Sequence, residues 1–71
     1  MYNVEINVKN MVTGDVCRKE IRKMYSLWGA RNWSREVIEC FDVDSVDIID
    51  TETGELMLSL SEAGVVWDSE G

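Results

Sequence analysis

Residues 45–60, SVDIIDTETGELMLSL, place two runs of aliphatic residues on either side of the segment DTETG. Within residues 46–48 and 56–60, every second side chain is aliphatic. Alternation with a period of two is typical of half-buried strands, and Asp, Thr and Gly are common in the turns between them. The stretch therefore predicts a β-hairpin closed by residues 50–54.

The register of this hairpin depends on Gly54. A plain four-residue loop would set Ile48 opposite Met57 and would turn three leucines away from the core. An extra residue in the left-handed conformation at Gly54 would shift the register by one. We predict this bulge because it gathers five aliphatic side chains on one face, each contributing about 1.5–3 kcal/mol when fully buried. These side chains are Val46, Ile48, Leu56, Leu58 and Leu60.

A second hairpin is predicted at the start of the chain. Residues 2–9 alternate apolar and polar side chains, and residues 10–14, NMVTG, supply the Asn and Gly of a loop built on a type I turn. Aligning the two Thr-Gly pairs places residues 6–16 over residues 46–56 with matching aliphatic and polar positions. The match predicts two hairpins of one type.

The return strand of the first hairpin, residues 15–22, has no clean apolar face. A short strand with charges on both faces is typical of a protected sheet edge, and we place it at an edge. Two interpretations of its charges remain open: a solvated edge, or a contact for an acidic partner or for the chain's own acidic half. The basic cluster here consists of Arg18, Lys19, Arg22 and Lys23.

The pattern becomes helical over residues 26–41, where apolar side chains recur at intervals of three and four. This spacing predicts one amphipathic helix of about four turns. Ser26 is a candidate N-cap, a start at Ser34 is the alternative, and Trp28 falls outside the apolar stripe. The stripe consists of Leu27, Ala30, Trp33, Val37 and Phe41.

These elements predict an α+β fold in the order β-β-α-β-β, a four-stranded antiparallel sheet with one helix packed on one face. We assign residues 1–60 to a single domain, since 71 residues leave no room for a second. Residues 61–71 form a C-terminal tail that is either frayed or held by Trp67, packed on the domain or anchoring a partner. The uncovered face would carry Asn3, Glu5, Asn7, Lys9, Asp47, Ile49, Met57 and Ser59.

The charge is divided unevenly along the chain. Residues 1–35 hold all seven basic residues and three acidic ones, a net charge of +4, whereas residues 36–71 hold eleven acidic residues and no basic one, a net charge of −11. Such asymmetry indicates a charged partner. Repulsion from phosphates argues against direct nucleic-acid binding by the second half.

Several kinds of chemistry are excluded. There is no histidine, no nucleophile elbow and no phosphate-binding loop, so we expect neither an enzyme nor a cofactor. Cys17 and Cys40 are too few for a disulfide framework or a zinc site. A calcium loop counted from Asp42 fails because its sixth and twelfth positions hold Asp47 and Thr53 in place of Gly and Glu. No apolar stretch is long enough for a membrane span and residues 1–10 resemble no leader, so we expect no membrane contact and a cytoplasmic location.

Three functional hypotheses remain: an acidic inhibitor that occupies the basic groove of a nucleic-acid-binding protein, a homodimer formed through a sheet edge or the surface of Ile49, Met57 and Trp67, and a solvated accessory domain. Carboxylates two residues apart on a strand lie about 6.6 Å apart, loosely like the phosphates of a nucleic-acid backbone. The candidate partner-binding residues are Asp42, Asp44, Asp47, Asp50, Glu52, Glu55 and Trp67.

The chain resembles the small acidic proteins of bacteriophages and other mobile elements, among them anti-CRISPR and related anti-defence inhibitors. The resemblance extends over the whole chain and consists of its size, its compact β/α build, its surplus of Asp and Glu, and hairpin segments such as DTETGE at residues 50–55. No shared binding motif accompanies it. The resemblance implies that the partner is a host protein, a CRISPR effector or another nucleic-acid-binding defence protein, in the host cytoplasm.

Overall fold

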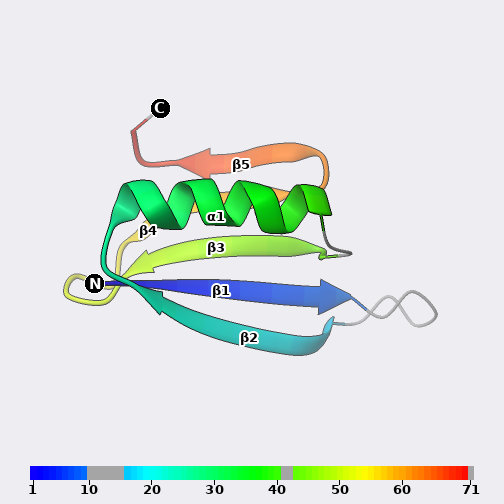
Figure 1. The fold of residues 1–71 in the computed structure, drawn as a ribbon, viewed down its shortest axis with the longest axis horizontal. Coiled ribbons are helices and arrows are strands. Elements are labelled where there is room, and N and C mark those ends of the chain that lie inside the picture. The colour runs from blue at the N-terminus through cyan, green and yellow to red at the C-terminus, as the bar shows by residue number, and fades with distance from the viewer. Residues whose placement is uncertain (10–15, 41–42, 71) are drawn as a thin grey trace.

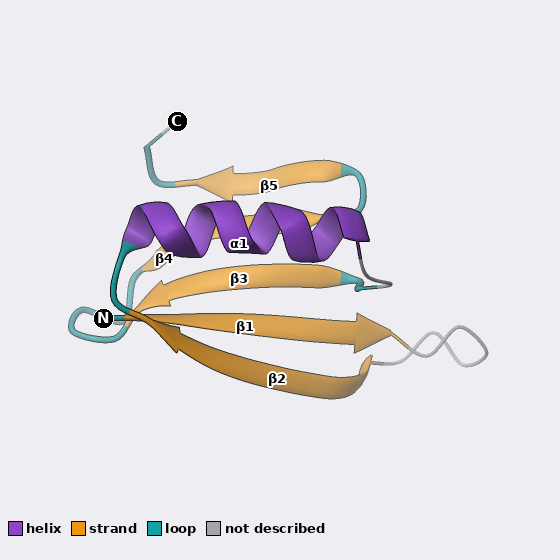
Figure 2. Cartoon of the chain, in the orientation of Figure 1, coloured by secondary structure: helices purple, strands orange, loops and turns teal. Residues whose placement is uncertain are grey.

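A computed structural model describes residues 1–9, 16–40 and 43–70 of the chain, as five strands and one helix. The strands form one antiparallel sheet in the order β2-β1-β3-β4-β5, and α1 lies across one of its faces (Figures 1 and 2). The elements are β1 Tyr2–Lys9, β2 Val16–Met24, α1 Leu27–Cys40, β3 Ser45–Asp50, β4 Leu56–Ser61 and β5 Gly64–Asp68.

The α+β class is confirmed, but the prediction of four strands is wrong. A fifth strand, β5, pairs with β4 within the segment that the sequence assigned to a tail. The turn before it is stabilised by the Ser61 hydroxyl, which accepts a hydrogen bond from the Ala63 N–H at 3.2 Å. A strand of five residues with three consecutive apolar side chains has no alternation, so its pattern alone did not distinguish it from a terminus.

β1 of the first hairpin pairs with β3 of the second, so the two hairpins lie side by side in the sheet. Residues 10–14, its predicted turn, are outside the described residues. β2 is an edge strand, as predicted, and it extends two residues beyond the predicted end, to Met24. Ile6 and Val46, which the internal repeat aligns with each other, are direct partners between β1 and β3.

The core lies between α1 and the sheet. The helix begins at Leu27 because the Ser26 hydroxyl caps it, accepting a hydrogen bond from the Gly29 N–H at 3.2 Å. Ser34 is therefore no helix start; it is fully buried, and its hydroxyl donates to the Ala30 carbonyl at 2.7 Å. Trp28 is 77% exposed, consistent with its place outside the stripe. The buried apolar side chains are Val4, Ile6, Ala30, Val37, Val43, Val46, Ile48, Leu58 and Leu60.

The second hairpin has the predicted register at its centre and a different bulge. Ile48 is opposite Leu58, but the register shifts between Ile48 and Ile49 rather than at Gly54. In the loop, the Asp50 N–H donates to the Glu55 carbonyl at 2.9 Å, and the Gly54 N–H donates to the Asp50 carbonyl at 2.8 Å. Gly54 has the predicted left-handed conformation, with φ of 75°. The side chains of Asp50 and Thr53 accept further hydrogen bonds from the turn backbone. The extra residue is Met57 of β4, which the register leaves unpaired between Leu56 and Leu58.

The displaced bulge removes one leucine from the predicted core. Leu56 is 37% exposed, whereas Leu58 and Leu60 are buried. Met57, expected on the uncovered face, is half-buried and packs against the core. Four of the five aliphatic side chains assigned to this face are therefore core residues, and Leu56 is the exception.

Replacing Gly54 tests its backbone conformation. Gly54 has φ of 75°, and a Cβ added there would meet nothing within 4 Å, so strain in the left-handed region is the main cost of a side chain. Gly54→Val should lower the free energy of unfolding by about 1–2 kcal/mol, and Gly54→Asn by less, because Asn tolerates this region. Urea denaturation of both variants measures the difference. Equal losses would show that conformation is not what selects glycine here.

Candidate interaction surface

The face of the sheet opposite α1 is crossed by a line of residues, one from each strand. Directly opposed residues of paired strands project to the same side of a sheet, so successive pairings trace the line across it. We call these five residues the cross-sheet row: Ile21, Glu5, Asp47, Ser59 and Trp67, from β2, β1, β3, β4 and β5 respectively. No element among the described residues covers this face.

The centre of the cross-sheet row is acidic. Glu5 and Asp47 are direct partners between β1 and β3, and side chains so placed have Cβ atoms about 4.5–5.5 Å apart. The Ser59 hydroxyl donates a hydrogen bond to Asp47 Oδ1 at 2.6 Å, so one oxygen of this carboxylate already has a partner. Both acidic side chains are half-buried in the surface. Two carboxylates are therefore neighbours at the middle of this uncovered face.

Apolar side chains lie at the two ends of the cross-sheet row. Ile21 is 58% exposed on edge strand β2, and Trp67 is 48% exposed on edge strand β5. Trp67 is thus ordered in a strand and leaves about half of its indole open to solvent. An amphipathic aromatic side chain in this position is the type of residue that anchors protein interfaces.

The predicted acidic residues do not form a single patch. Asp47 lies in the cross-sheet row, and Glu52 and Glu55 are exposed at the tip of the β3–β4 hairpin beside half-buried Asp50. Asp44 precedes β3 at the other end, six residues from Asp50, or about 20 Å along an extended strand. Asp42 lies outside the described residues. The structure therefore places Asp47 and Trp67 in the same row, with Ser59 between them, and separates Asp44 from the hairpin tip.

Glu5 is the residue that the predicted site omitted. Its position on the polar face of residues 2–9 could be derived from alternation, but its contact with Asp47 depends on the pairing of β1 with β3. Nothing local in the sequence determines which strands are neighbours. The hairpin tip is close to the N terminus for the same reason: the Thr51 N–H donates to the Met1 carbonyl at 3.1 Å (Figure 1).

An ion pair attaches β5 to the helix. Arg31 of α1 donates to both carboxylate oxygens of Asp68, at 3.0 Å from Nη1 to Oδ1 and 2.6 Å from Nη2 to Oδ2. The hydrogen bonds from Arg31, together with one from the Glu70 N–H, lower the pKa of Asp68 from 3.8 to about 2. The same contact raises the pKa of Arg31. This bidentate pair positions the strand that carries Trp67.

Removing this pair should loosen β5 selectively. Asp68→Asn should speed amide exchange in residues 64–68 and destabilise the protein above about pH 4. Because the folded-state pKa is the lower one, the stabilisation is present above 3.8 and is lost as the pH falls towards about 2. The difference between wild type and variant should therefore vanish over that interval in urea titrations at successive pH values. Glu62→Gln, an exposed neighbour, is the matched control, and an equal effect from it would contradict the assignment.

Other kinds of site find little support in the described ranges. No three Cys, Asp or Glu side chains there are grouped so that they could hold a metal ion. Cys40 is a free, exposed thiol at the end of α1. Among the same residues, no helix has the length and apolar character needed to cross a membrane. Comparisons with protein-family models, curated proteins and solved structures found no match.

Proposed function

We propose that this protein is a small acidic inhibitor that binds the basic, nucleic-acid-binding surface of another protein and makes no direct contact with nucleic acid. The observation that carries the proposal is the cross-sheet row, in which the facing carboxylates Glu5 and Asp47 lie on an uncovered sheet between exposed Ile21 and Trp67. The resemblance to anti-CRISPR and related inhibitors supports a host defence protein as the partner.

The distribution of charge supports a basic target. The chain carries −7 overall and no basic residue after Arg35. Adjacent strands are about 4.8 Å apart, so the facing carboxylates of Glu5 and Asp47 lie at a separation comparable with the spacing of neighbouring phosphates. Such a surface attracts Lys and Arg side chains that otherwise bind phosphates.

The expected contact combines charge with an apolar anchor. Carboxylates at the centre of the cross-sheet row would pair with cations of the partner, and the indole of Trp67 would pack against an aliphatic or cationic side chain. Charge accelerates association, whereas the anchor slows dissociation. This division predicts that Trp67→Ala chiefly raises the dissociation rate.

Competition with DNA tests the proposal. The immobilised protein should retain nucleic-acid-binding proteins from a bacterial lysate at low salt, and duplex DNA should release them, because both ligands occupy one surface. Purified complexes should weaken steeply as salt is raised. Formation of a stable ternary complex with DNA, or binding indifferent to salt, would reject the mimicry.

The alternative function, a homodimeric interaction module, is favoured by one observation. β5 is an edge strand on which Val65 and Val66 are both exposed beside Trp67. Exposed apolar side chains on an edge strand are a common basis for strand pairing between copies. The register shift within β5 interrupts that edge, which is why we place this function second. A concentration-independent monomer in sedimentation would remove it.

A further inference from the structure

The outer edge of β2 is open to a further strand. β2 is the first strand of the sheet, and among the described residues no strand pairs with its outer side. α1 lies towards the middle of the sheet and leaves this edge clear (Figure 1). The main-chain N–H and C=O groups along such an edge can pair with another strand. The side chains of residues 20–23 therefore decide which strand fits there.

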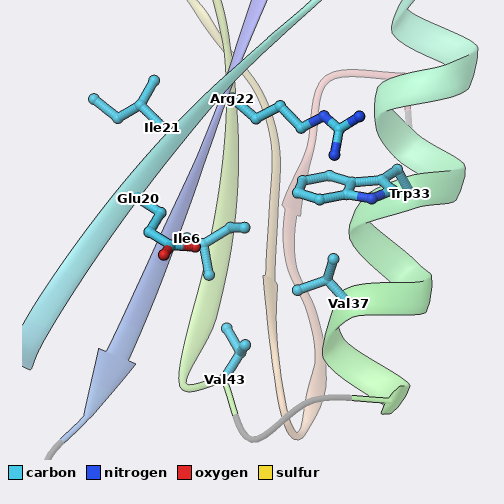
Figure 3. Close-up of a pocket in the computed structure, with 7 residues that line it drawn as sticks. All are labelled: Ile6, Glu20, Ile21, Arg22, Trp33, Val37 and Val43. Carbon is cyan, nitrogen blue, oxygen red and sulfur yellow. The ribbon is translucent and has the colours of Figure 1, made fainter.

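Two exposed side chains of opposite charge project from β2 to the helix side of the sheet. Glu20 is opposite Ile6 of β1, and Arg22 is opposite Val4. Figure 3 shows both charged side chains beside a pocket of about 500 Å³ between β2 and α1, with Ile21 on the other side of the strand. A strand that set apolar side chains beside these charges would desolvate both and pair neither. The edge therefore excludes most strands and accepts one whose charges match it in position.

The segment Glu20-Ile21-Arg22 is complementary to itself when two copies of β2 run antiparallel. In a pairing centred on Ile21, Glu20 of each copy is opposite Arg22 of the other, which gives two ion pairs on the helix side. Direct partners have Cβ atoms about 4.5–5.5 Å apart, within reach of hydrogen bonds from Arg to a carboxylate. The two Ile21 side chains, each 58% exposed in the single chain, are opposite each other on the uncovered face.

The charges also exclude the neighbouring registers. Two-fold pairing sets residues of the same face opposite each other, so the nearest alternatives are centred on Glu20 or on Arg22. The first opposes two carboxylates and the second two guanidinium groups, and like charges directly opposite are destabilising. The register centred on Ile21 does set Lys23 opposite position 19 of the other copy, also a lysine. Lys23 is exposed, and its flexible chain can turn the ammonium group into solvent, where salt screens the repulsion.

We propose that this protein forms a two-fold dimer in which the β2 strands of two copies pair antiparallel about Ile21, with reciprocal ion pairs between Glu20 and Arg22. The two sheets become one sheet of ten strands, five from each copy, with both helices on the same face. Because Ile21 ends the cross-sheet row, the two rows join end to end on the opposite face. The contact differs from the β5 pairing considered above and does not depend on the proposed inhibitor function.

Complementary charge reversals test this register. Glu20→Arg and Arg22→Glu each set like charges opposite each other in both pairs of a homodimer, so each should weaken self-association by about tenfold or more in sedimentation equilibrium. When the two variants are mixed, both pairs of the heterodimer unite Arg with Glu. The mixture should therefore associate within about threefold of the wild type. The variant that carries both changes should dimerise by itself, and recovery in the mixture shows that each single variant is folded.

Matched controls separate this contact from total charge and from β5. Glu36→Arg and Arg35→Glu, at exposed positions of α1, change the net charge by the same amounts and should alter self-association by less than about twofold. Val66→Lys on β5 should also leave it unchanged. The proposal would be overturned by a wild type that stays monomeric up to about 1 mM, by loss of the dimer in Val66→Lys, or by a mixture of Glu20→Arg and Arg22→Glu that does not associate.

Discussion

Leu58→Ala should lower the free energy of unfolding by about 2–5 kcal/mol, and Leu56→Ala by less than about 1 kcal/mol. Leu58 is fully buried beneath α1 and is opposite fully buried Ile48. Truncating it removes apolar contacts and leaves a cavity that a small core closes only in part. Leu56, two residues earlier on β4, is 37% exposed and loses much less.

The size of the chain makes this loss large. A domain of 71 residues has a total stability of about 4–10 kcal/mol at the usual value per residue. Leu58→Ala should therefore bring the protein close to unfolding at room temperature. Urea denaturation measures both variants, and unchanged m values would show that each still unfolds as one unit. Equal losses would place Leu56 in the core, as the predicted bulge at Gly54 required.

Neutralising Asp47 and the hairpin tip should have the largest effect on partner binding. The variant carries Asp47→Asn, Asp50→Asn, Glu52→Gln and Glu55→Gln, and it should weaken the complex about a hundredfold at low salt. The replacements keep the acceptor oxygens that bond Ser59 and the turn backbone, so the fold should persist. The salt dependence of the remaining affinity should be correspondingly shallower.

The control variant has the same net charge in another place. Glu36→Gln, Glu39→Gln, Asp44→Asn and Glu62→Gln also change the net charge from −7 to −3, but these residues lie on α1, before β3 and in the β4–β5 turn. We expect this variant to lose only a few-fold in affinity. Titration calorimetry against the purified partner compares the two. Equal losses would mean that only total charge matters and that Asp47 and the hairpin tip are not part of the binding surface.

The fold brings together only some of the predicted partner-binding residues. Asp47 lies on the uncovered face as alternation indicated, and the hairpin tip presents Glu52 and Glu55 to solvent. Asp44 lies at the opposite end of β3 from the hairpin tip, because an extended strand separates residues that are only six positions apart in the sequence. Glu5 was missed as a neighbour of Asp47 because forty-two residues of sequence separate the two partners of one strand pair.

Local sequence determined the helix and most of the strands of this protein, but not β5. Alternation defined β1, helical spacing and the Ser26 cap defined α1, and the turn residues between β3 and β4 defined the second hairpin, because each pattern acts between residues a few positions apart. Tertiary structure decided the strand order, the bulge in β4, the fifth strand held by Arg31 and Asp68, and the pocket beside β2. These depend on which distant segments become neighbours, and that choice rests on burial and pairing summed over the whole domain, which no short stretch encodes.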